Sequence, residues 1–395
     1  MKLKQLYYAH VFLLSALGSV IACSPTKFSP SVAQNADCTA GCIVDPSGTQ
    51  NWDQSHKVGT GKVDILFVND NSASMSVIQY RLAQAFTGFI QQLDGREIDY
   101  KIAMTTTDAT KLSASPLITF ANNSTFLTRS DSNRANMFNA AIVRSETLAC
   151  ENMIKSYYNT YGPSFQTLAS YNTAYNNTCA SGDERGIKAA NYVLTNNVGS
   201  FVRSDAHLNI IALSNEDVRS GNTSSFEADD RASALTSLIN TKFSSKYWEF
   251  NSIIVKDAVC ATAQKEAFKT QSGVTIKDQY GNYVIGANPG MEYWALSSSA
   301  SQDIDGNAQP RGQIISICES NYSNYFNNMA AKVADSARRF DLKCSPAAAP
   351  VVEVANNPAA TVPHTWNGSY IVFNRGSEGI QVRIKYTCPK TGGVQ

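Results

Sequence analysis

Residues 63–75 read VDILFVNDNSASM, and this stretch decides the fold. Its first six residues are an apolar run bounded by turn residues, a pattern typical of a central strand buried on both faces. After the polar loop, apolar residues recur at helical spacing until Gly95 ends the pattern, at Ile78, Leu82, Phe86, Phe89, Ile90 and Leu93. The stretch therefore predicts a buried strand, a polar loop and an amphipathic helix, in that order.

The same alternation continues along the chain. We expect further strands and helices, the strands at residues 100–105, 208–213, 250–255 and 313–318 and the helices at 183–194, 232–239 and 322–340. Repeated units of this kind build a doubly wound, mostly parallel sheet, in which ligands bind beyond the carboxyl ends of the strands. We therefore expect an α/β fold over residues 61–343. Residues 109–180 and 219–231 are longer than usual connections and are predicted to be inserted loops.

The composition changes on both sides of this domain. Residues 23–60 are rich in Ser, Pro, Gly, Asn and Thr without an apolar period, and they are predicted to form a flexible tether. Residues 344–395 carry an apolar run at 370–373 and an apolar–polar alternation from 380 to 386. These residues are predicted to form a small C-terminal β unit.

The amino terminus has the features of an export signal, which we place at residues 1–22. Lys2 and Lys4 precede an apolar run at residues 11–21 that is too short to span a bilayer comfortably. Residues 20–23, Val-Ile-Ala-Cys, resemble a bacterial lipobox, which implies cleavage before Cys23 and its acylation. Ser24 after the cysteine implies export to the outer membrane. The alternative is an ordinary signal peptide in which Cys23 is incidental.

The sequence contains nine cysteines, and an even set remains when Cys23 is set aside. In an oxidising compartment, such a set predicts disulfides. Neighbours in the sequence suggest the pairs Cys38–Cys42, Cys150–Cys179, Cys260–Cys318 and Cys344–Cys388, although other connectivities are open. We expect no zinc site, because no histidine lies at ligand spacing from a cysteine pair.

Charge and motifs exclude several classes of function. The formal net charge is +1, so the chain as a whole has no electrostatic attraction for nucleic acid or an anionic membrane. Residues 59–62, Gly-Thr-Gly-Lys, superficially resemble a phosphate-binding loop, but they enter a strand and lack its glycine spacing. No Gly-x-Ser-x-Gly motif of a hydrolase is present. We therefore expect neither an enzyme nor a nucleic-acid partner.

The polar loop after the first strand carries an Asp-x-Ser-x-Ser pattern. Asp70, Ser72 and Ser74 stand at alternate positions, so that all three side chains can turn toward one point. Carboxylate and hydroxyl oxygens are the hard ligands that Mg²⁺ prefers. The alternative is a polar turn that caps the following helix. Because the pattern directly follows a buried strand, metal binding is favoured.

On these residues the chain resembles a von Willebrand factor A (VWA) domain, and over residues 62–340 it resembles A-domain lipoproteins of Gram-negative bacteria. The resemblance implies a metal-ion-dependent adhesion site (MIDAS). In such a site Ser72 and Ser74 bind Mg²⁺ (or Mn²⁺ or Ca²⁺), and Asp70 acts largely through water or hydrogen bonds. The family also supplies an aspartate and a threonine from two further loops. Here those positions offer Asn215, Glu216 or Asp217 for the aspartate, and Ser181 or Asp183 for the threonine.

The resemblance further implies a function. We expect an envelope-anchored, metal-dependent adhesion module that captures an acidic group of a protein or surface ligand and contacts the membrane through its lipid anchor. The alternative is a degenerate VWA scaffold with a metal-independent structural role in an envelope assembly. That alternative is motivated by Asn215, because an amide in place of a carboxylate weakens the attraction for a divalent cation.

Overall fold

The computed structural model describes residues 38, 41–59, 61–219, 226–244, 246–272 and 286–389. The expected signal peptide, Cys23 and most of the expected tether lie outside these residues. The main body is a six-stranded sheet that consists, in spatial order, of β10 (Ile314–Ser316), β7 (Trp248–Ile254), β6 (His207–Ser214), β3 (Lys62–Asn69), β4 (Asp99–Thr106) and β5 (Leu127–Thr128). All neighbours are parallel except β5, which runs antiparallel to β4. The expected α/β class with a mostly parallel sheet is therefore confirmed.

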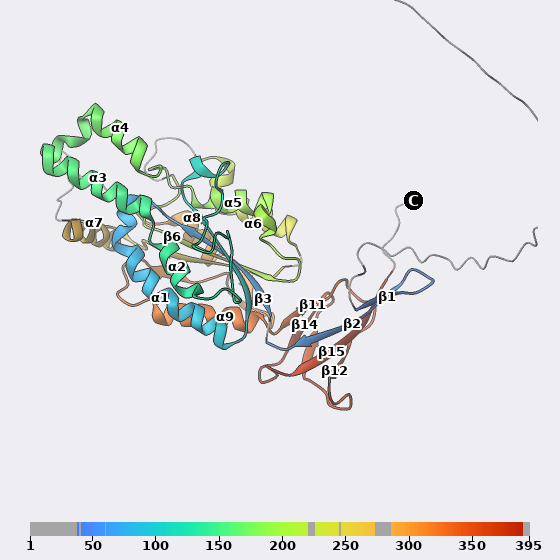
Figure 1. Cartoon of the computed structure of the whole chain (residues 1–395). Helices are drawn as coiled ribbons and strands as arrows, with labels where there is room; N and C mark the ends of the chain where they lie inside the picture. Colours follow the sequence, from blue (N-terminus) through green and yellow to red (C-terminus); the bar gives the residue numbers. More distant parts are fainter. Residues whose placement is uncertain are drawn as a thin grey trace, which may run out of the picture.

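Helices cover both faces of this sheet (Figure 1). One face packs against α1 (Ser76–Gly95), α2 (Arg134–Ile142), α7 (Ala258–Ser272) and α9 (Ser323–Ser336). The other face packs against α5 (Gly186–Asn196), α6 (Ala232–Lys242) and α8 (Met291–Ser298). β3 contributes to both cores, since Phe67 packs on the first face and Leu66 on the second. Within the described residues, no helix is long and apolar enough to cross a membrane.

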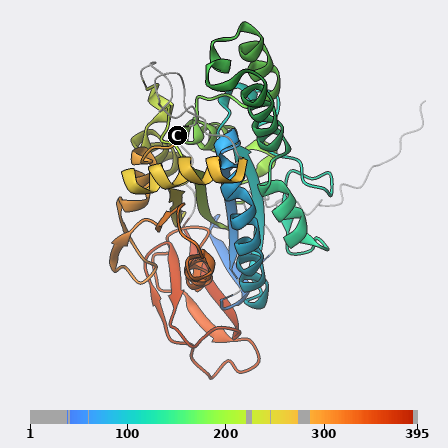
Figure 2. The ribbon, with the colours of Figure 1, turned by 90° about the vertical axis from the view of Figure 1, so that its left-hand side faces the viewer.

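Residues 109–180 are largely helical, whereas we expected inserted loops. They contain β5, α2, the short 3-10 helices η2 (Ala109–Lys111) and η3 (Gly162–Thr167), and the helices α3 (Ser145–Tyr161) and α4 (Ala169–Thr178). Phe165 and Tyr171 pack edge to face at 4.7 Å between α3 and α4, and the Cys150–Cys179 disulfide ties the two helices together. The α3–α4 pair projects from the end of the sheet opposite the C-terminal strands (Figure 2).

A separate β unit is built from both ends of the described chain. A four-stranded sheet contains, in order, β1 (Cys42–Val44), β2 (Gln50–Lys57), β15 (Gln381–Cys388) and β12 (Val351–Val354). A three-stranded sheet contains β11 (Arg339–Asp341), β14 (Tyr370–Phe373) and β13 (His364–Trp366). Side chains from both sheets, including Trp52, Phe373 and Ile384, form one apolar core.

Two expectations about the ends of the domain are corrected by this unit. Residues 42–57 are not a flexible tether, because β2 pairs with β15 over eight residues. The β unit also begins before residue 344, since β11 ends the helical run that we expected to reach residue 340. A β hairpin of β8 (Ala300–Gln302) and β9 (Ala308–Pro310) connects α8 to β10.

All four disulfides that sequence proximity suggests are present. The structure contains Cys38–Cys42, Cys150–Cys179, Cys260–Cys318 and Cys344–Cys388. The third joins α7 to the segment after β10, and the fourth closes the β unit. The cysteine pairing is therefore local in sequence, as predicted.

His207, at the start of β6, leads to a prediction about pH. Its side chain is buried, its Nδ1 has no hydrogen-bond partner among the described residues, and burial lowers its pKa to about 4. The unfolded chain takes up a proton at this residue near pH 6.5, and the folded chain does so only near pH 4, so the residue reduces stability as the pH falls between these values. We expect His207→Gln to lose less stability than wild type over this range, by about 3 kcal/mol at pH 4. Urea unfolding at several pH values measures the difference, and parallel profiles would contradict the prediction.

Candidate functional site

The candidate site lies at the carboxyl ends of β3 and β6. Asp70 directly follows β3, and its backbone N–H donates to the carbonyl oxygen of Leu213 in β6 at 2.9 Å. Because β3 and β6 are parallel neighbours, the loops that follow them meet at the same edge of the sheet. The sequence placed the Asp-x-Ser-x-Ser loop at this edge, and the structure agrees.

Polar side chains from the two loops form a chain of short contacts. The Ser72 backbone N–H donates to Oδ1 of Asp70 at 2.9 Å, and the Oγ atoms of Ser72 and Ser74 lie 3.0 Å apart. Oγ of Ser74 donates to Oδ1 of Asn215 at 3.2 Å. Nδ2 of Asn215 donates a hydrogen bond to the carbonyl oxygen of Gly286 at 3.0 Å. Asp70, Ser72, Ser74 and Asn215 are therefore brought together.

Asp70 is fully buried and carries the acidic group of the loop. Oγ of Ser214 donates to Oδ2 of Asp70 at 2.8 Å. Burial raises the pKa of Asp70, and the hydrogen bonds from Ser72 and Ser214 oppose that rise. No salt bridge in the described part of the chain includes Asp70. The site therefore holds a buried carboxylate that is stabilised by hydrogen bonds alone.

Two buried glutamates lie near Asp70, and sequence reasoning identified only one of them. Glu216 was expected, and its side chain is 7% exposed. Glu184 was not expected, and it is 2% exposed, with an Oε2 atom that has no hydrogen-bond partner among the described residues. The pKa of Glu184 is well above its usual value because of burial and because of the negative charges of Glu216 and Asp70.

The backbone around Glu184 explains its burial. The Arg185 N–H donates to the carbonyl oxygen of Thr107, and the Arg219 N–H donates to that of Glu184, at 2.9 and 2.8 Å. Glu184 also forms an isolated antiparallel bridge with Asp108. These contacts hold the chain extended, so α5 begins at Gly186 and not at residue 183 as we expected.

The remaining predicted ligands have other hydrogen-bond partners. Oδ1 of Asp217 accepts the Glu292 N–H in the first turn of α8 at 3.0 Å, and burial raises the pKa of Asp217. Oγ of Ser181 accepts the Asp183 N–H at 3.2 Å, and Oδ2 of Asp183 lies 3.6 Å from Nη1 of Arg219. No hydrogen bond found among the described residues joins any of these three to Asp70, so their role in metal binding stays a prediction.

Three helices hold the backbone of the Asp-x-Ser-x-Ser loop. Nε2 of Gln79 in α1 donates to the carbonyl oxygen of Asp70 at 3.0 Å, and Nε2 of Gln264 in α7 donates to that of Ser74 at 3.1 Å. Oγ1 of Thr147 in α3 donates to the carbonyl oxygen of Asn71 at 2.9 Å. The loop is therefore anchored on α1, α3 and α7, and its side-chain oxygens remain directed to the sheet edge.

The donor set limits the chemistry of the site. Over the described ranges, no group of three or more His, Cys, Asp or Glu side chains is arranged to hold a metal ion. The oxygens that do converge are serine hydroxyls, one amide and the carboxylate of Asp70. These are hard ligands of the kind that suits Mg²⁺ or Mn²⁺. Soft-metal chemistry has no support from these residues.

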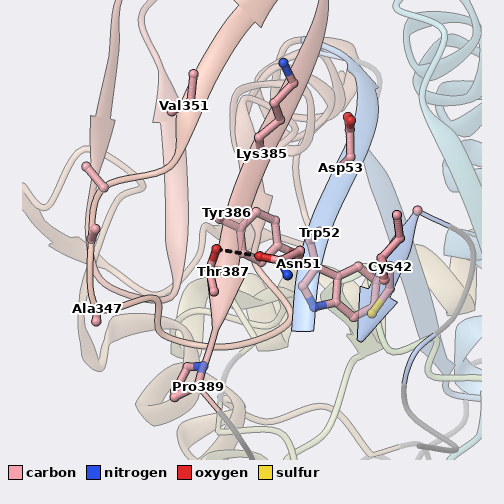
Figure 3. Close-up of a pocket in the computed structure, with 14 residues that line it drawn as sticks. Cys42, Asn51, Trp52, Asp53, Ala347, Val351, Lys385, Tyr386, Thr387 and Pro389 are labelled. Carbon is pink, nitrogen blue, oxygen red and sulfur yellow. Dashed lines mark hydrogen bonds between the residues drawn. The ribbon is translucent and has the colours of Figure 1, made fainter. Parts of the chain in front are cut away.

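A groove of about 840 Å³ lies on the β unit, away from this site (Figure 3). Ile43 and Val351 are exposed apolar side chains in its wall. Lys385, which also lines the groove, is paired with Glu353 at 2.8 Å. Oγ1 of Thr387 donates to Oδ1 of Asn51 at 3.0 Å, as Figure 3 shows. The groove is a mostly apolar surface of the β unit and shares no residue with the candidate site.

Comparisons with known proteins assign no family. Neither a protein-family model nor a curated protein matches the chain. Among solved structures, the pilus adhesin SpaC from Lactobacillus rhamnosus GG is 11% identical, with a TM-score of 0.28 over 90% of this chain and 45% of its own. Proximal thread matrix protein 1 from the mussel byssus is 10% identical, with a TM-score of 0.28 over 74% of this chain and 52% of its own. Human COPII-coat protein Sec24c is 7% identical, with a TM-score of 0.29 over 85% of this chain and 45% of its own. The chain thus spans about half the length of these proteins, and likeness at this level carries no function.

Proposed function

We propose that this chain is a cation-dependent binding module of the VWA type, in which a divalent cation at Asp70, Ser72 and Ser74 captures an acidic group of a partner. The single observation that carries the proposal is the contact chain from Asp70 through Ser72 and Ser74 to Asn215 at the carboxyl ends of β3 and β6. In α/β sheets this edge is where ligands bind.

The residues fit such a cation. A buried carboxylate without an ion pair is unfavourable, and Asp70 is in that position among the described residues. A nearby Mg²⁺ or Mn²⁺ would relieve that cost, and the serine hydroxyls add hard oxygen ligands. When bound, the cation supplies a positive charge that attracts a carboxylate. The chain's own contribution is to hold Asp70, Ser72 and Ser74 in place through Gln79 and Gln264.

The proposal extends to location and partner. An envelope protein anchored through acylated Cys23 would place this site outside the cytoplasm, and the four disulfides are compatible with an oxidising compartment. The partner is a protein or surface ligand that presents a carboxylate. Asn215 favours the second candidate, a metal-independent scaffold, because it carries no charge.

Water-proton relaxation in the presence of Mn²⁺ tests the proposal on the purified full chain. We expect the chain to enhance relaxation by Mn²⁺, because a bound ion tumbles with the protein and keeps exchangeable water. Acetate should then reduce the enhancement by displacing that water, while Mn²⁺ remains bound in equilibrium dialysis. A chain that gives no enhancement would contradict metal binding and favour the scaffold. An enhancement that acetate leaves unchanged would contradict carboxylate capture.

A further inference from the structure

We propose that Glu184 supplies the negative charge that Asn215 lacks, so that the cation site depends on Asp70 and Glu184 together. This inference rests on the proposed cation-binding function and adds a residue that the Asp-x-Ser-x-Ser pattern does not include. Asn215 offers only an amide oxygen, at 3.2 Å from Oγ of Ser74. Attraction for a divalent cation depends strongly on nearby negative charge, especially where burial lowers the dielectric.

Glu184 is a buried acid without a basic partner among the described residues. It is 2% exposed, and Oε2 accepts no hydrogen bond from the described residues. A buried carboxylate is normally neutralised by a basic side chain, by a proton or by a cation. No salt bridge within the described ranges includes Glu184. The structure therefore leaves this carboxyl group available for another positive charge.

The neighbouring guanidinium groups are engaged elsewhere. Arg185 chelates Asp230, with Nε to Oδ1 and Nη2 to Oδ2 both at 2.8 Å. Nη1 of Arg219 lies 3.3 Å from Oε1 of Glu227. The Arg219 N–H donates to the carbonyl oxygen of Glu184, and its guanidinium group lies 3.6 Å from the carboxylate of Asp183. Neither neighbouring guanidinium group is therefore paired with the carboxyl group of Glu184.

The Glu184 segment lies beside the carboxyl end of β3, because a Cβ atom on Gly186 would come within 2.9 Å of Cγ1 of Val68. Burial raises the pKa of Glu184, and the charges of Glu216 and Asp70 add to that rise. Burial raises the pKa of the half-buried Tyr175 in α4 and of the buried Tyr293 in α8, and the charges of Glu184 and Asp70 add to both rises. Negative potential is therefore concentrated between α4, α8 and the ends of β3 and β6.

Glu184 acts on the cation through its charge. The described acidic side chains do not converge as three metal ligands, so we do not assign Glu184 a position in a carboxylate cage. If Glu184 acts through its charge, a carboxylate at a neighbouring position can replace it. If Glu184 acts through packing, such a carboxylate cannot replace it. Transferring the charge from residue 184 to residue 215 is therefore the discriminating experiment.

Mn²⁺ titration calorimetry on the full chain measures this effect. We expect Glu184→Gln to weaken Mn²⁺ binding by about tenfold or more, which corresponds to about 1.4 kcal/mol. The double variant Glu184→Gln/Asn215→Asp should bind within about threefold of wild type, because the charge is restored at the adjacent loop. The matched control Glu249→Gln, which changes a buried glutamate at the amino-terminal end of β7, should bind like wild type. Thermal unfolding without metal checks that each variant is folded.

The possible outcomes separate the two proposals. Wild type that binds Mn²⁺ no better than Glu184→Gln, with measurable heat in both, would overturn the role of Glu184 and leave the cation site intact. Weakening that Asn215→Asp does not reverse would indicate a packing role and would also overturn the inference. Absence of Mn²⁺ binding by wild type would overturn the proposed function itself. If Glu184→Gln fails to fold, Asn215→Asp alone provides the test, since an added charge should tighten binding over wild type.

Discussion

Asp70→Asn is expected to weaken Mn²⁺ binding by about 100-fold while the metal-free chain stays at least as stable as wild type. The side chain keeps its shape, so Oδ1 can still accept the Ser72 N–H. The new Nδ2 can donate to Oγ of Ser214, whose single hydroxyl proton can then be donated to the carbonyl oxygen of Glu216, 2.8 Å away. The buried charge is lost. Because burial raises the pKa of Asp70 in the folded state, its ionisation reduces stability as the pH rises, and its removal should stabilise the metal-free chain at neutral pH.

The opposite directions of these two effects make the variant informative. Calorimetry measures Mn²⁺ binding, and urea unfolding in the presence of a chelator measures stability. Asp303→Asn is the matched control, since Asp303 accepts backbone N–H groups of Asp305 and Asn307 in the exposed β8–β9 turn. That variant should bind Mn²⁺ like wild type. Equal Mn²⁺ affinity of wild type and Asp70→Asn would contradict the assignment of Asp70.

Arg203→Met is expected to destabilise the chain by about 3–5 kcal/mol, the largest stability effect that we predict. Asp64 lies in the central strand β3 and is fully buried. Arg203 contacts it through its backbone N–H and through Nε, each at 2.7 Å, and its Nη2 also donates to the carbonyl oxygen of Asp99. Burial raises the pKa of Asp64 and Arg203 opposes that rise, so removal of the guanidinium leaves an uncompensated buried charge.

Two further variants identify the cause of that loss. Arg203→Met/Asp64→Asn should recover a large part of the stability, because the uncompensated charge is removed with its partner. Arg383→Met breaks an exposed ion pair with Asp53 in the β unit and should cost little stability, because water screens that pair. Urea unfolding at pH 7 measures all three. Equal losses for Arg203→Met and Arg383→Met would show that burial of Asp64 does not decide the effect.

The central strands were predictable because their signal is local. β3, β4, β6 and β7 begin and end within one or two residues of the expected positions, since each is an apolar run between polar turns. The loop of Asp70, Ser72 and Ser74 follows directly from the first of them. Its approach to Asn215 then follows from the parallel pairing of β3 with β6.

The features that sequence reasoning missed depend on distant contacts. β2 reads QNWDQSHK, with Trp52 as its one large buried apolar residue, and it is stabilised by pairing with β15 about 330 residues later. The α3–α4 pair has no strong apolar stripe, and it is held by a small aromatic cluster and a disulfide. Glu184 was expected in the first turn of the helix at residues 183–194, where an acidic side chain is ordinary. Its burial accompanies backbone contacts with Asp108 and Arg219, which lie far from it in the sequence.

Anomalous diffraction from crystals of the full chain soaked in Mn²⁺ tests the cation site most directly. We expect an anomalous peak beyond the carboxyl end of β3, within coordination distance of the side-chain oxygens of Ser72 and Ser74 and beside Asp70. The peak should vanish in crystals of Asp70→Asn grown under the same conditions. Wild-type crystals that show no peak at these residues would contradict the cation-dependent function.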